Sequence, residues 1–178
     1  KYLGSLVFVS KDKKDLNQSD ILILPGVGAF PKGMTNLKKY DLYHFIKDKA
    51  LNGDSLIGIC LGMQMLFEDS DEFQKTSGLN LIKGNIKIMN NKIKLPHMGW
   101  NKIFSTKNNN YGLGNTYQYF VHSYVGYNVI PEQVIYKSTY CDENFIAGVK
   151  KNNIIGLQFH PERSGKSGME LLTTIILD

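Results

Sequence analysis

Cys60 is the residue of this sequence best suited to covalent chemistry. The apolar run Leu56–Ile59 leads into it, and glycines stand two residues before and two residues after it in the string GICLG. This spacing is typical of a nucleophile elbow, in which a strand turns sharply into a helix and lifts the nucleophile clear of the sheet. The positive end of the helix would favour the thiolate. A lone cysteine is more often a small buried hydrophobe, but this context favours a nucleophile.

The string GLQFHPE indicates an acid/base pair, because His160 and Glu162 follow an apolar run and stand two residues apart. Such residues share one side of an extended chain, and Pro161 keeps His160 out of helical geometry. Glu162 can then accept a hydrogen bond from one ring nitrogen and fix the tautomer that a general base needs. A lone histidine more often has no catalytic role. Three other histidines are weaker candidates, because they lie in an amphipathic helix or lack a nearby carboxylate: His44, His97 and His122.

The string LPGVGA, residues 24–29, is a third candidate site. Its glycines, Gly26 and Gly28, free the backbone to present amide hydrogens to a developing oxyanion. An ordinary turn at the end of a strand explains the same string equally well when it is viewed alone. Phosphate binding is excluded, because no Gly-Lys-Ser/Thr follows and the dinucleotide-binding spacing is missing.

Composition limits the class of protein. A chain of 178 residues with 42% hydrophobic content predicts a single domain over residues 1–178. The net charge of +5 comes from scattered lysines, which argues against nucleic-acid binding. Only two cysteines occur, Cys60 and Cys141, and there is no signal-peptide pattern or long apolar span. We therefore expect a soluble cytoplasmic protein that does not bind membranes.

The elements that would position these residues follow from the hydrophobic pattern. Continuous apolar runs at Leu6–Val9, Ile21–Leu24 and Leu56–Ile59 predict strands covered on both faces, and Asp41–Ala50 predicts a helix that ends before Gly53. The segment Met169–Ile176 predicts a last helix, and 108–110 an exposed loop. Shorter strands are expected at Leu81–Met89, Lys92–Leu95, Tyr117–Val121, Val134–Ser138, Phe145–Val149 and Ile154–Phe159, the last after a turn at 151–153.

Taken together, the three candidate segments resemble class I glutamine amidotransferases, whose Cys-His-Glu triad matches Cys60, His160 and Glu162. More narrowly, the sequence is similar to the glutaminase subunits of imidazole glycerol phosphate synthase, from histidine biosynthesis. That narrower likeness spans most of the chain and depends on five strings: LPGVGAF, GICLGMQMLF, LPHMGWN, YFVHSY and GLQFHPE.

The resemblance implies an α/β fold, a flavodoxin-like three-layer sandwich with a largely parallel central sheet. Family members usually carry a first strand and helix that are not found here, and Lys1–Gly4 resembles the last turn of a helix. We therefore expect the domain to be incomplete at its N-terminus. Arg163 also departs from the family, in which lysine is common after His-Pro-Glu; arginine keeps the charge and changes the hydrogen-bond geometry.

The resemblance further implies roles for particular residues. The oxyanion site would be formed by Gly26, Val27, Gly28 and the amide of Leu61. Glutamine would be contacted by Gly28, Gln64, His122, Ser123 and Tyr124. The surface toward the partner would include Met98, Trp100, Tyr119 and Arg163. As structural alternatives, Trp100 and Tyr119 could be core aromatics and Gln64 a solvated helix residue.

The implied activity is hydrolysis of glutamine to glutamate, with ammonia passed to a (β/α)₈-barrel synthase subunit in a heterodimer. That partner would make imidazole glycerol phosphate and an aminoimidazole carboxamide ribotide, and the glutaminase step would need no metal or organic cofactor. Three alternatives stay open. The chain could serve a surface-sugar amidotransferase, act as a catalytically silent module that binds glutamine or only the partner, or work alone as a thiol hydrolase on peptides or esters.

Overall fold

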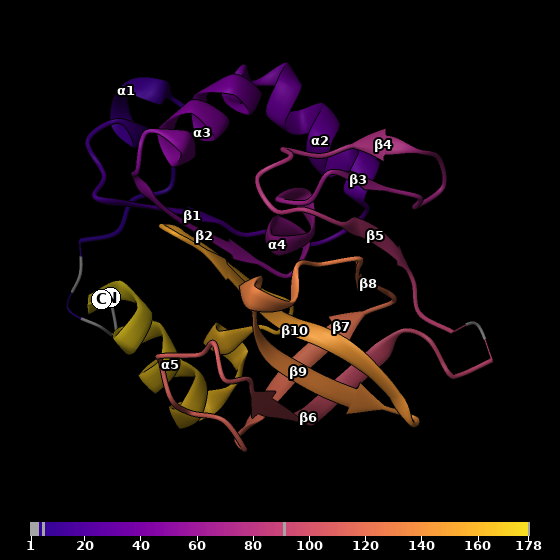
Figure 1. Cartoon of the computed structure of the whole chain (residues 1–178). Helices are drawn as coiled ribbons and strands as arrows, with labels where there is room; N and C mark the ends of the chain where they lie inside the picture. Colours follow the sequence, from indigo (N-terminus) through magenta and orange to yellow (C-terminus); the bar gives the residue numbers. More distant parts are fainter. Residues whose placement is uncertain (1–3, 5, 91, 178) are drawn as a thin grey trace.

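The computed structural model describes residues 4, 6–90 and 92–177. Its main feature is a seven-stranded sheet in which the first three strands are mutually parallel and every later pair is antiparallel (Figure 1). In spatial order the strands are β1 (Ile21–Leu24), β2 (Ser55–Ile59), β11 (Ile154–Leu157), β10 (Glu143–Lys151), β9 (Val134–Tyr140), β6 (His97–Ser105) and β7 (Tyr117–His122).

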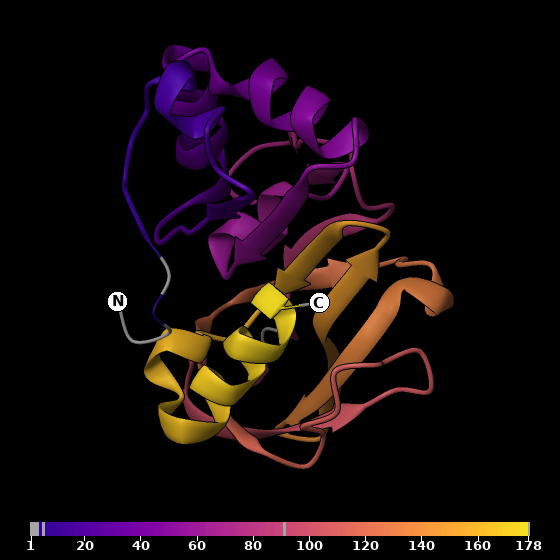
Figure 2. The same ribbon diagram turned by 90° about the vertical axis from the view of Figure 1, so that its left-hand side faces the viewer.

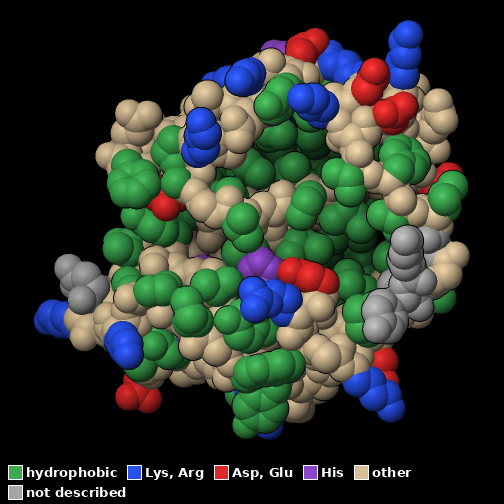
Figure 3. Space-filling view, turned by 180° about the vertical axis from the view of Figure 1, so that it is seen from behind, with side chains coloured by type: hydrophobic (Ala, Val, Ile, Leu, Met, Phe, Trp, Pro, Cys, Tyr) green, Lys and Arg blue, Asp and Glu red, His purple; other side chains and the backbone are tan. Residues whose placement is uncertain are grey.

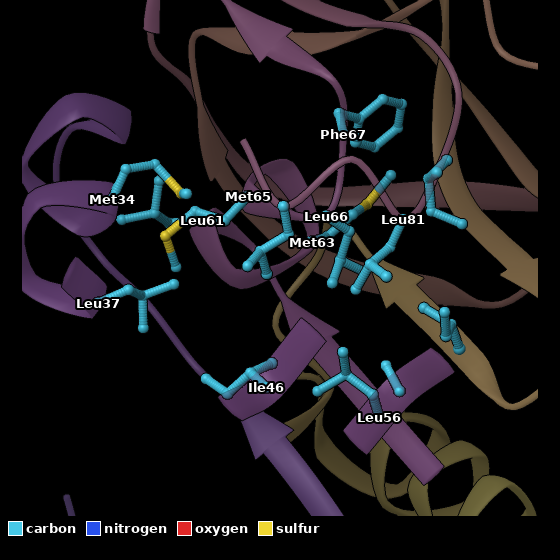
Figure 4. Packing of buried hydrophobic residues seen from close by; sticks show 14 of the residues in the cluster. Met34, Leu37, Ile46, Leu56, Leu61, Met63, Met65, Leu66, Phe67 and Leu81 are labelled. Carbon is cyan, nitrogen blue, oxygen red and sulfur yellow. The ribbon is translucent and has the colours of Figure 1, made fainter. Parts of the chain in front are cut away.

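Helices cover both faces of the parallel strands. Figures 1 and 2 show α2 (Phe30–Lys39) and α3 (Leu42–Leu51) on one side and α5 (Gly165–Leu177) on the other. The side chains of β2 alternate accordingly: Leu56 joins the core under α2 and α3, whereas Ile57 joins the core that contains residues of α5. Figure 4 shows the first of these cores, where side chains from α2, α3, β2 and the segment 61–67 point toward one another.

The remaining elements are short. A second sheet has the order β4-β3-β5-β8. Its strands are β3 (Asp69–Ser70), β4 (Thr76–Ser77), β5 (Asn85–Ile88) and β8 (Tyr124–Tyr127). The short helices are α1 (Lys13–Leu16), α4 (Leu61–Met65), and the 3₁₀ turns η1 (Pro131–Gln133) and η2 (Pro161–Arg163). No helix within the described ranges is long and apolar enough to cross a membrane.

The expected α/β layering is confirmed, but the expectation of a largely parallel sheet is wrong. Parallel neighbours need a long crossover between them, and α2 and α3 supply one between β1 and β2. The connection from β10 to β11 is a two-residue turn that pairs Lys151 with Ile154, so these strands can only be antiparallel. The expected turn at 151–153 is thereby confirmed.

Several predicted elements agree with the structure and others do not. The strands expected at Ile21–Leu24, Leu56–Ile59, Tyr117–Val121, Val134–Ser138, Phe145–Val149 and Ile154–Phe159 correspond to β1, β2, β7, β9, β10 and β11, and the helices at Asp41–Ala50 and Met169–Ile176 to α3 and α5. The run Leu6–Val9 is not a strand: no described strand pairs with it, and Leu6 and Val9 are almost wholly exposed. The expected helix end at Lys1–Gly4 lies mostly outside the described residues.

Two further strand predictions fail for local reasons. The segment Lys92–Leu95 forms a turn, because the amide of Lys92 donates to the side chain of Asn90 and that of Ile93 to the Asn90 carbonyl. The strand expected from Leu81 begins only at Asn85, since the amides of Leu81 and Ile82 are bonded to the Leu66 carbonyl. Residues 108–110 lie in a loop as expected.

The end of β1 approaches the start of α4 so closely that only glycine fits there. A Cβ built on Gly62 would lie 1.7 Å from the carbonyl oxygen of Leu24, and one on Gly58 would lie 2.8 Å from backbone atoms of Gly62. Both obstacles are backbone, which cannot move aside as a flexible side chain can. The glycines of the GICLG string are therefore needed for the packing of three chain segments as well as for the turn.

This close approach predicts that Gly62→Ala is severely destabilising, by about 3 kcal/mol or more, because the sheet and α4 would have to separate. Gly33→Ala in α2 is the matched control: its nearest obstacle is the sulfur of the Met65 side chain, which can move, so its effect should stay within about 1 kcal/mol. Urea unfolding of the two variants measures the difference. Equal stabilities would contradict the proposed packing constraint.

Candidate active site

Cys60 lies at the turn between β2 and α4 and adopts a strained backbone. Its φ of 53° and ψ of −110° fall outside the regions that non-glycine residues favour. Its amide donates to the carbonyl of Leu157 at 2.8 Å, which ties the turn to the end of β11, and the residue is buried. The elbow geometry is thus present. Because α4 has only five residues, its dipole contributes less to thiolate stability than a long helix would.

His160 and Glu162 form the hydrogen bond expected from their spacing. Nδ1 of His160 lies 2.7 Å from Oε1 of Glu162, so the imidazole donates from Nδ1 and presents Nε2 on its other side. Nε2 is buried and makes no hydrogen bond of normal geometry among the described residues. The backbone at His160 is held by a bond from its amide to the carbonyl of Tyr119, at 2.8 Å.

In this pair each residue stabilises the charged form of the other. The neighbouring Cys60 sulfur, as an acceptor that can carry negative charge, and then the Glu162 carboxylate raise the pKa of His160 to about 9. Partial burial opposes ionisation of Glu162, but the hydrogen bond from His160 outweighs it and the pKa of Glu162 is lowered. The arrangement therefore favours an imidazolium between a carboxylate and a sulfur that can carry negative charge.

The glycine loop after β1 lies against the start of α4. A Cβ on Gly26 would be 3.0 Å from Cβ of Leu61 and 3.3 Å from the amide nitrogen of Gly62, so the loop and the Cys60 elbow are neighbours. Gly28 has a φ of 99°, which explains why glycine stands there. Val27 and Gly28 are exposed. The structure thus places Gly26 beside Leu61, the residue that follows the nucleophile.

Glu72 anchors the far end of this loop and was not found from the sequence. Its buried carboxylate accepts a hydrogen bond from the amide of Phe30, at 2.7 Å, where α2 begins. A carboxylate at a helix N-terminus satisfies an amide that has no partner within the helix. The sequence signal was weak, because Glu72 lies far along the chain in a segment rich in acidic residues.

Gln64 is not a solvated helix residue, because its amide is buried within a hydrogen-bond network. Its Nε2 donates to the carbonyl of Tyr124 at 3.0 Å and to Oε1 of Gln158 at 3.2 Å. Nε2 of Gln158 in turn lies 3.9 Å from Sγ of Cys60, and the carbonyl of Val121 lies 3.8 Å from the same sulfur. Gln158 belongs to the GLQFHPE string, but the sequence does not predict its contact with the sulfur.

His122 directs its ring into the protein. Nε2 of His122 lies 3.0 Å from Nδ1 of His97, and Nδ1 of His122 lies 3.1 Å from the carbonyl of Tyr124. Both ring nitrogens are thus engaged by protein groups. Burial lowers the pKa of His97 to about 4, and burial together with the charge of His97 lowers that of His122 to about 3. Ser123 and Tyr124 are half-buried, and the carbonyl of Ser123 accepts from the amide of Met89.

Two aromatic side chains close to the triad lie at the surface: Trp100 is exposed and Tyr119 is half-buried. Trp100 and Met98 on β6 are more than half exposed, and the rings of Trp100 and Tyr119 meet edge to face at 6.2 Å. The guanidinium of Arg163 stacks 4.7 Å from the centre of the Tyr119 ring. Figure 3 shows a face of the molecule with a hollow lined by hydrophobic side chains and, beside it, a histidine next to acidic and basic groups.

Comparison with known proteins identifies the family. Residues 6–178 match the family model described as glutamine amidotransferase class-I. The chain is 43% identical over 177 residues to the imidazole glycerol phosphate synthase subunit HisH of Lactococcus lactis, covering 98% of this chain and 87% of that one. The HisH subunit of Bacillus mycoides is also 43% identical over 177 residues, with 97% and 83% covered. The chain belongs to the HisH branch of the class-I glutamine amidotransferases.

Solved structures agree on the fold. A crystal structure of a glutamine amidotransferase superimposes with a TM-score of 0.76 at 17% identity, over 97% of this chain and 88% of that one. The glutaminase domain of Trypanosoma brucei CTPS, solved with bound acivicin, gives 0.62 at 14% identity, over 98% and 81%. The predictions of the family, the α/β fold class and a glutaminase-type enzyme of histidine biosynthesis are confirmed, whereas the single domain and the individual residue roles stay predictions.

The buried histidine pair predicts a loss of stability in mild acid. The folded chain keeps His97 and His122 neutral down to about pH 4 and 3, whereas the unfolded chain protonates them near 6.5. Their contribution is therefore complete above pH 6.5 and lost as the pH falls, by about 1.4 kcal/mol per pH unit for each ring. Urea unfolding is compared at pH 6.2 and 5.2, because above this range His160, whose pKa is raised to about 9, would itself gain stability as the pH falls. The comparison should show the loss in the wild type and much less of it in the double variant His97→Phe/His122→Phe. His44→Gln, at an exposed histidine of α3, should behave as the wild type; an equal loss in the double variant would contradict the assignment.

Proposed function

We propose that this chain releases ammonia from glutamine by thiol chemistry at Cys60 and delivers it to a synthase subunit. The observation that carries this is the geometry of His160: Nδ1 is bound to Glu162 at 2.7 Å, and Nε2 is buried without a normal hydrogen bond beside the Cys60 elbow. A nucleophile, a base with one free nitrogen and a group that orients the base are the parts that acyl transfer needs.

In the proposed mechanism the thiolate of Cys60 attacks the side-chain carbonyl carbon of glutamine. A C–S bond forms and the carbonyl electrons move to oxygen, where amides of the Gly26–Gly28 loop and of Leu61 would stabilise the oxyanion. When the tetrahedral intermediate collapses, the C–N bond breaks, and His160 gives its Nε2 proton to the departing ammonia. The product is a glutamyl thioester.

Hydrolysis would complete the cycle. Neutral His160 takes a proton from water, the hydroxide attacks the thioester carbonyl, and the C–S bond breaks to release glutamate and restore the thiolate. Glu162 stays ionised throughout and holds His160 in the right tautomer, which its lowered pKa favours. The proposed steps use only side chains and backbone amides of this chain.

The substrate would lie between the glycine loop and the segment of Ser123 and Tyr124, with Gln64 at its side. Gln64 is buried and bonded to the Tyr124 carbonyl, which fixes its amide in one orientation. This supports a role in hydrogen bonding to the substrate. Because both ring nitrogens of His122 are engaged by the protein, we propose that this residue contributes through its backbone.

The partner would be a synthase subunit, because the HisH relatives are subunits of imidazole glycerol phosphate synthase. We propose a (β/α)₈ barrel that uses the ammonia to make imidazole glycerol phosphate and an aminoimidazole carboxamide ribotide, in the cytoplasm. The surface cluster of Met98, Trp100, Arg163 and the half-buried Tyr119 supports a protein interface next to the triad, since aromatic residues, methionine and arginine are enriched in interfaces.

Substitution of the triad should separate chemistry from binding. Cys60→Ala should abolish glutamate release, because the proposed thioester forms on the Cys60 sulfur and Cys141 is not part of the triad. Glu162→Gln should keep the fold but lower kcat by about 10²- to 10⁴-fold. A neutral amide cannot stabilise the imidazolium, and its NH₂ group can face Nδ1 of His160 and favour the wrong tautomer. Glutamate release by the complex, with thermal unfolding as the control for folding, measures both. Full activity of Cys60→Ala would contradict the mechanism and would mean that Cys60 has no catalytic role.

Stimulation by the partner should identify the pathway. We expect slow glutamate release by the chain alone and strong stimulation when a barrel synthase subunit and its phosphoribulosyl substrate are added. Trp100→Ala should weaken binding of the partner and leave the reactivity of Cys60 toward iodoacetamide unchanged, because Trp100 is exposed on β6, whereas the polar groups beside the sulfur include those of Val121 and Gln158. Absence of stimulation despite a reactive Cys60 would instead indicate a sugar-amidating partner, and fast hydrolysis without any partner would indicate a free thiol hydrolase.

A further inference from the structure

A line of buried amide groups connects Gln64 to the sulfur of Cys60. Gln158 follows β11 and is completely buried, and its amide nitrogen in the backbone is bonded to the carbonyl of Ala147. Its side chain lies between the other two groups: Oε1 accepts from Gln64 at 3.2 Å, and Nε2 points to Sγ of Cys60 at 3.9 Å. A fully buried glutamine is uncommon, and the reaction steps described above do not use it.

The direction of every hydrogen bond in this line follows from one backbone carbonyl. The oxygen of Tyr124 can only accept, so the atom of Gln64 that faces it must be the donor Nε2. The second hydrogen of this nitrogen goes to Gln158, which must therefore present Oε1 to Gln64 and Nε2 to the sulfur. The orientation of both amides thus rests on partners of fixed type, which is how amide orientations are properly assigned.

The same carbonyl also fixes the histidine pair. His122 donates to the Tyr124 oxygen from Nδ1, so its Nε2 must accept from Nδ1 of His97. The two lone pairs of the Tyr124 carbonyl are thereby used by Gln64 and His122. This leaves the amide of Gln64 no freedom to rotate without breaking a buried hydrogen bond, which is costly.

Besides His160, two polar groups lie near the sulfur of Cys60, and they have opposite effects on the stability of its thiolate. The carbonyl of Val121, at 3.8 Å, can accept from a thiol but repels a thiolate. The N–H of Gln158, at 3.9 Å, favours the thiolate, because a donor aimed at a charged acceptor stabilises its charged form. Removing Gln158 would therefore leave the Val121 carbonyl to destabilise the thiolate without the N–H donor that offsets it.

We infer that Gln158 is a positioning residue for the reaction, which holds the Cys60 sulfur as a thiolate and locks the amide of Gln64 with Oε1 left to accept from a donor group of the substrate. It acts through Cys60 and Gln64 and does not itself touch the reacting carbonyl. The inference rests on the proposed glutaminase function, and it assigns to one buried amide an effect on both nucleophile and substrate binding.

The test compares three variants of the full chain. Gln158→Met keeps the length and fills the space without a donor, and Gln158→Glu keeps the shape but places a carboxyl group at the sulfur. Gln118→Met is the matched control, because Gln118 is also completely buried but its Nε2 lies near the hydroxyls of Thr116 and Ser167. Alkylation by iodoacetamide is followed at the Cys60 peptide by mass spectrometry from pH 5 to 10, with exposed Cys141 as an internal reference.

Loss of the donor should move the midpoint of the Cys60 alkylation profile up by about half to one pH unit in Gln158→Met, and further in Gln158→Glu. Cys141 and the Gln118→Met variant should keep the wild-type profiles. In the complex with the synthase subunit, Gln158→Met should raise KM for glutamine by about fivefold or more and also lower kcat, because Gln64 loses a fixed partner. A purely structural role would lower the thermal midpoint of both Met variants alike and move neither profile.

Unchanged alkylation profiles in folded Gln158→Met and Gln158→Glu would overturn the inference while the proposed glutaminase function stands. If the Gln158 variants do not fold, Gln64→Met takes their place: it frees the Gln158 amide to rotate and should move the Cys60 midpoint upward as well, and an unchanged midpoint there overturns the inference. A wild-type Cys60 that is no more reactive than Cys141, together with no glutamate release in the complex, would overturn the proposed function and this inference with it.

Discussion

Between β2 and α4 the chain reverses direction at a single residue, Cys60. Its φ of 53° together with its ψ of −110° is unfavourable for every residue except glycine. Strain of this kind costs about 1–3 kcal/mol and persists only where the surroundings over-determine it. Here β2 is hydrogen-bonded to β1 on one side and β11 on the other, and Leu61 and Met63 of α4 are buried. The sheet and the core beneath α4 therefore hold the nucleophile out of the strand.

The same anchoring brings the other parts of the site together. The end of β1 lies against Gly62, so the glycine loop arrives beside the elbow, and Glu72 holds the far end of that loop at the start of α2. The end of β11 carries Gln158 and then His160, and it is tied to the elbow through the Cys60 amide. Three strand ends thus meet at one edge of the sheet, as is common for sites of α/β proteins.

The sequence predicted what depends on neighbours along the chain. The glycines around Cys60 and the two-residue spacing of His160 and Glu162 carry their geometry within a few residues. The sequence did not predict Gln158 or Glu72 as parts of the site, because the role of each depends on a contact with a residue far away in sequence. Helix α2 was also missed, although Phe30, Met34 and Leu37 are buried at helical spacing; Gly33 and Pro31 obscured the pattern. The run Leu6–Val9 shows the opposite error, since an apolar segment becomes a strand only when another strand pairs with it.

The pairing of β2 with β11 has a consequence for how the protein is made. Leu56–Ile59 leave the ribosome early, but their parallel partner Ile154–Leu157 is synthesised more than half a chain length later. Such distant contacts form late, because the intervening chain must first be closed into a loop. On a nascent chain Cys60 is therefore an ordinary thiol without its elbow. Reactivity at this sulfur appears only when the C-terminal strands are in place, so an incomplete polypeptide does not expose an activated nucleophile.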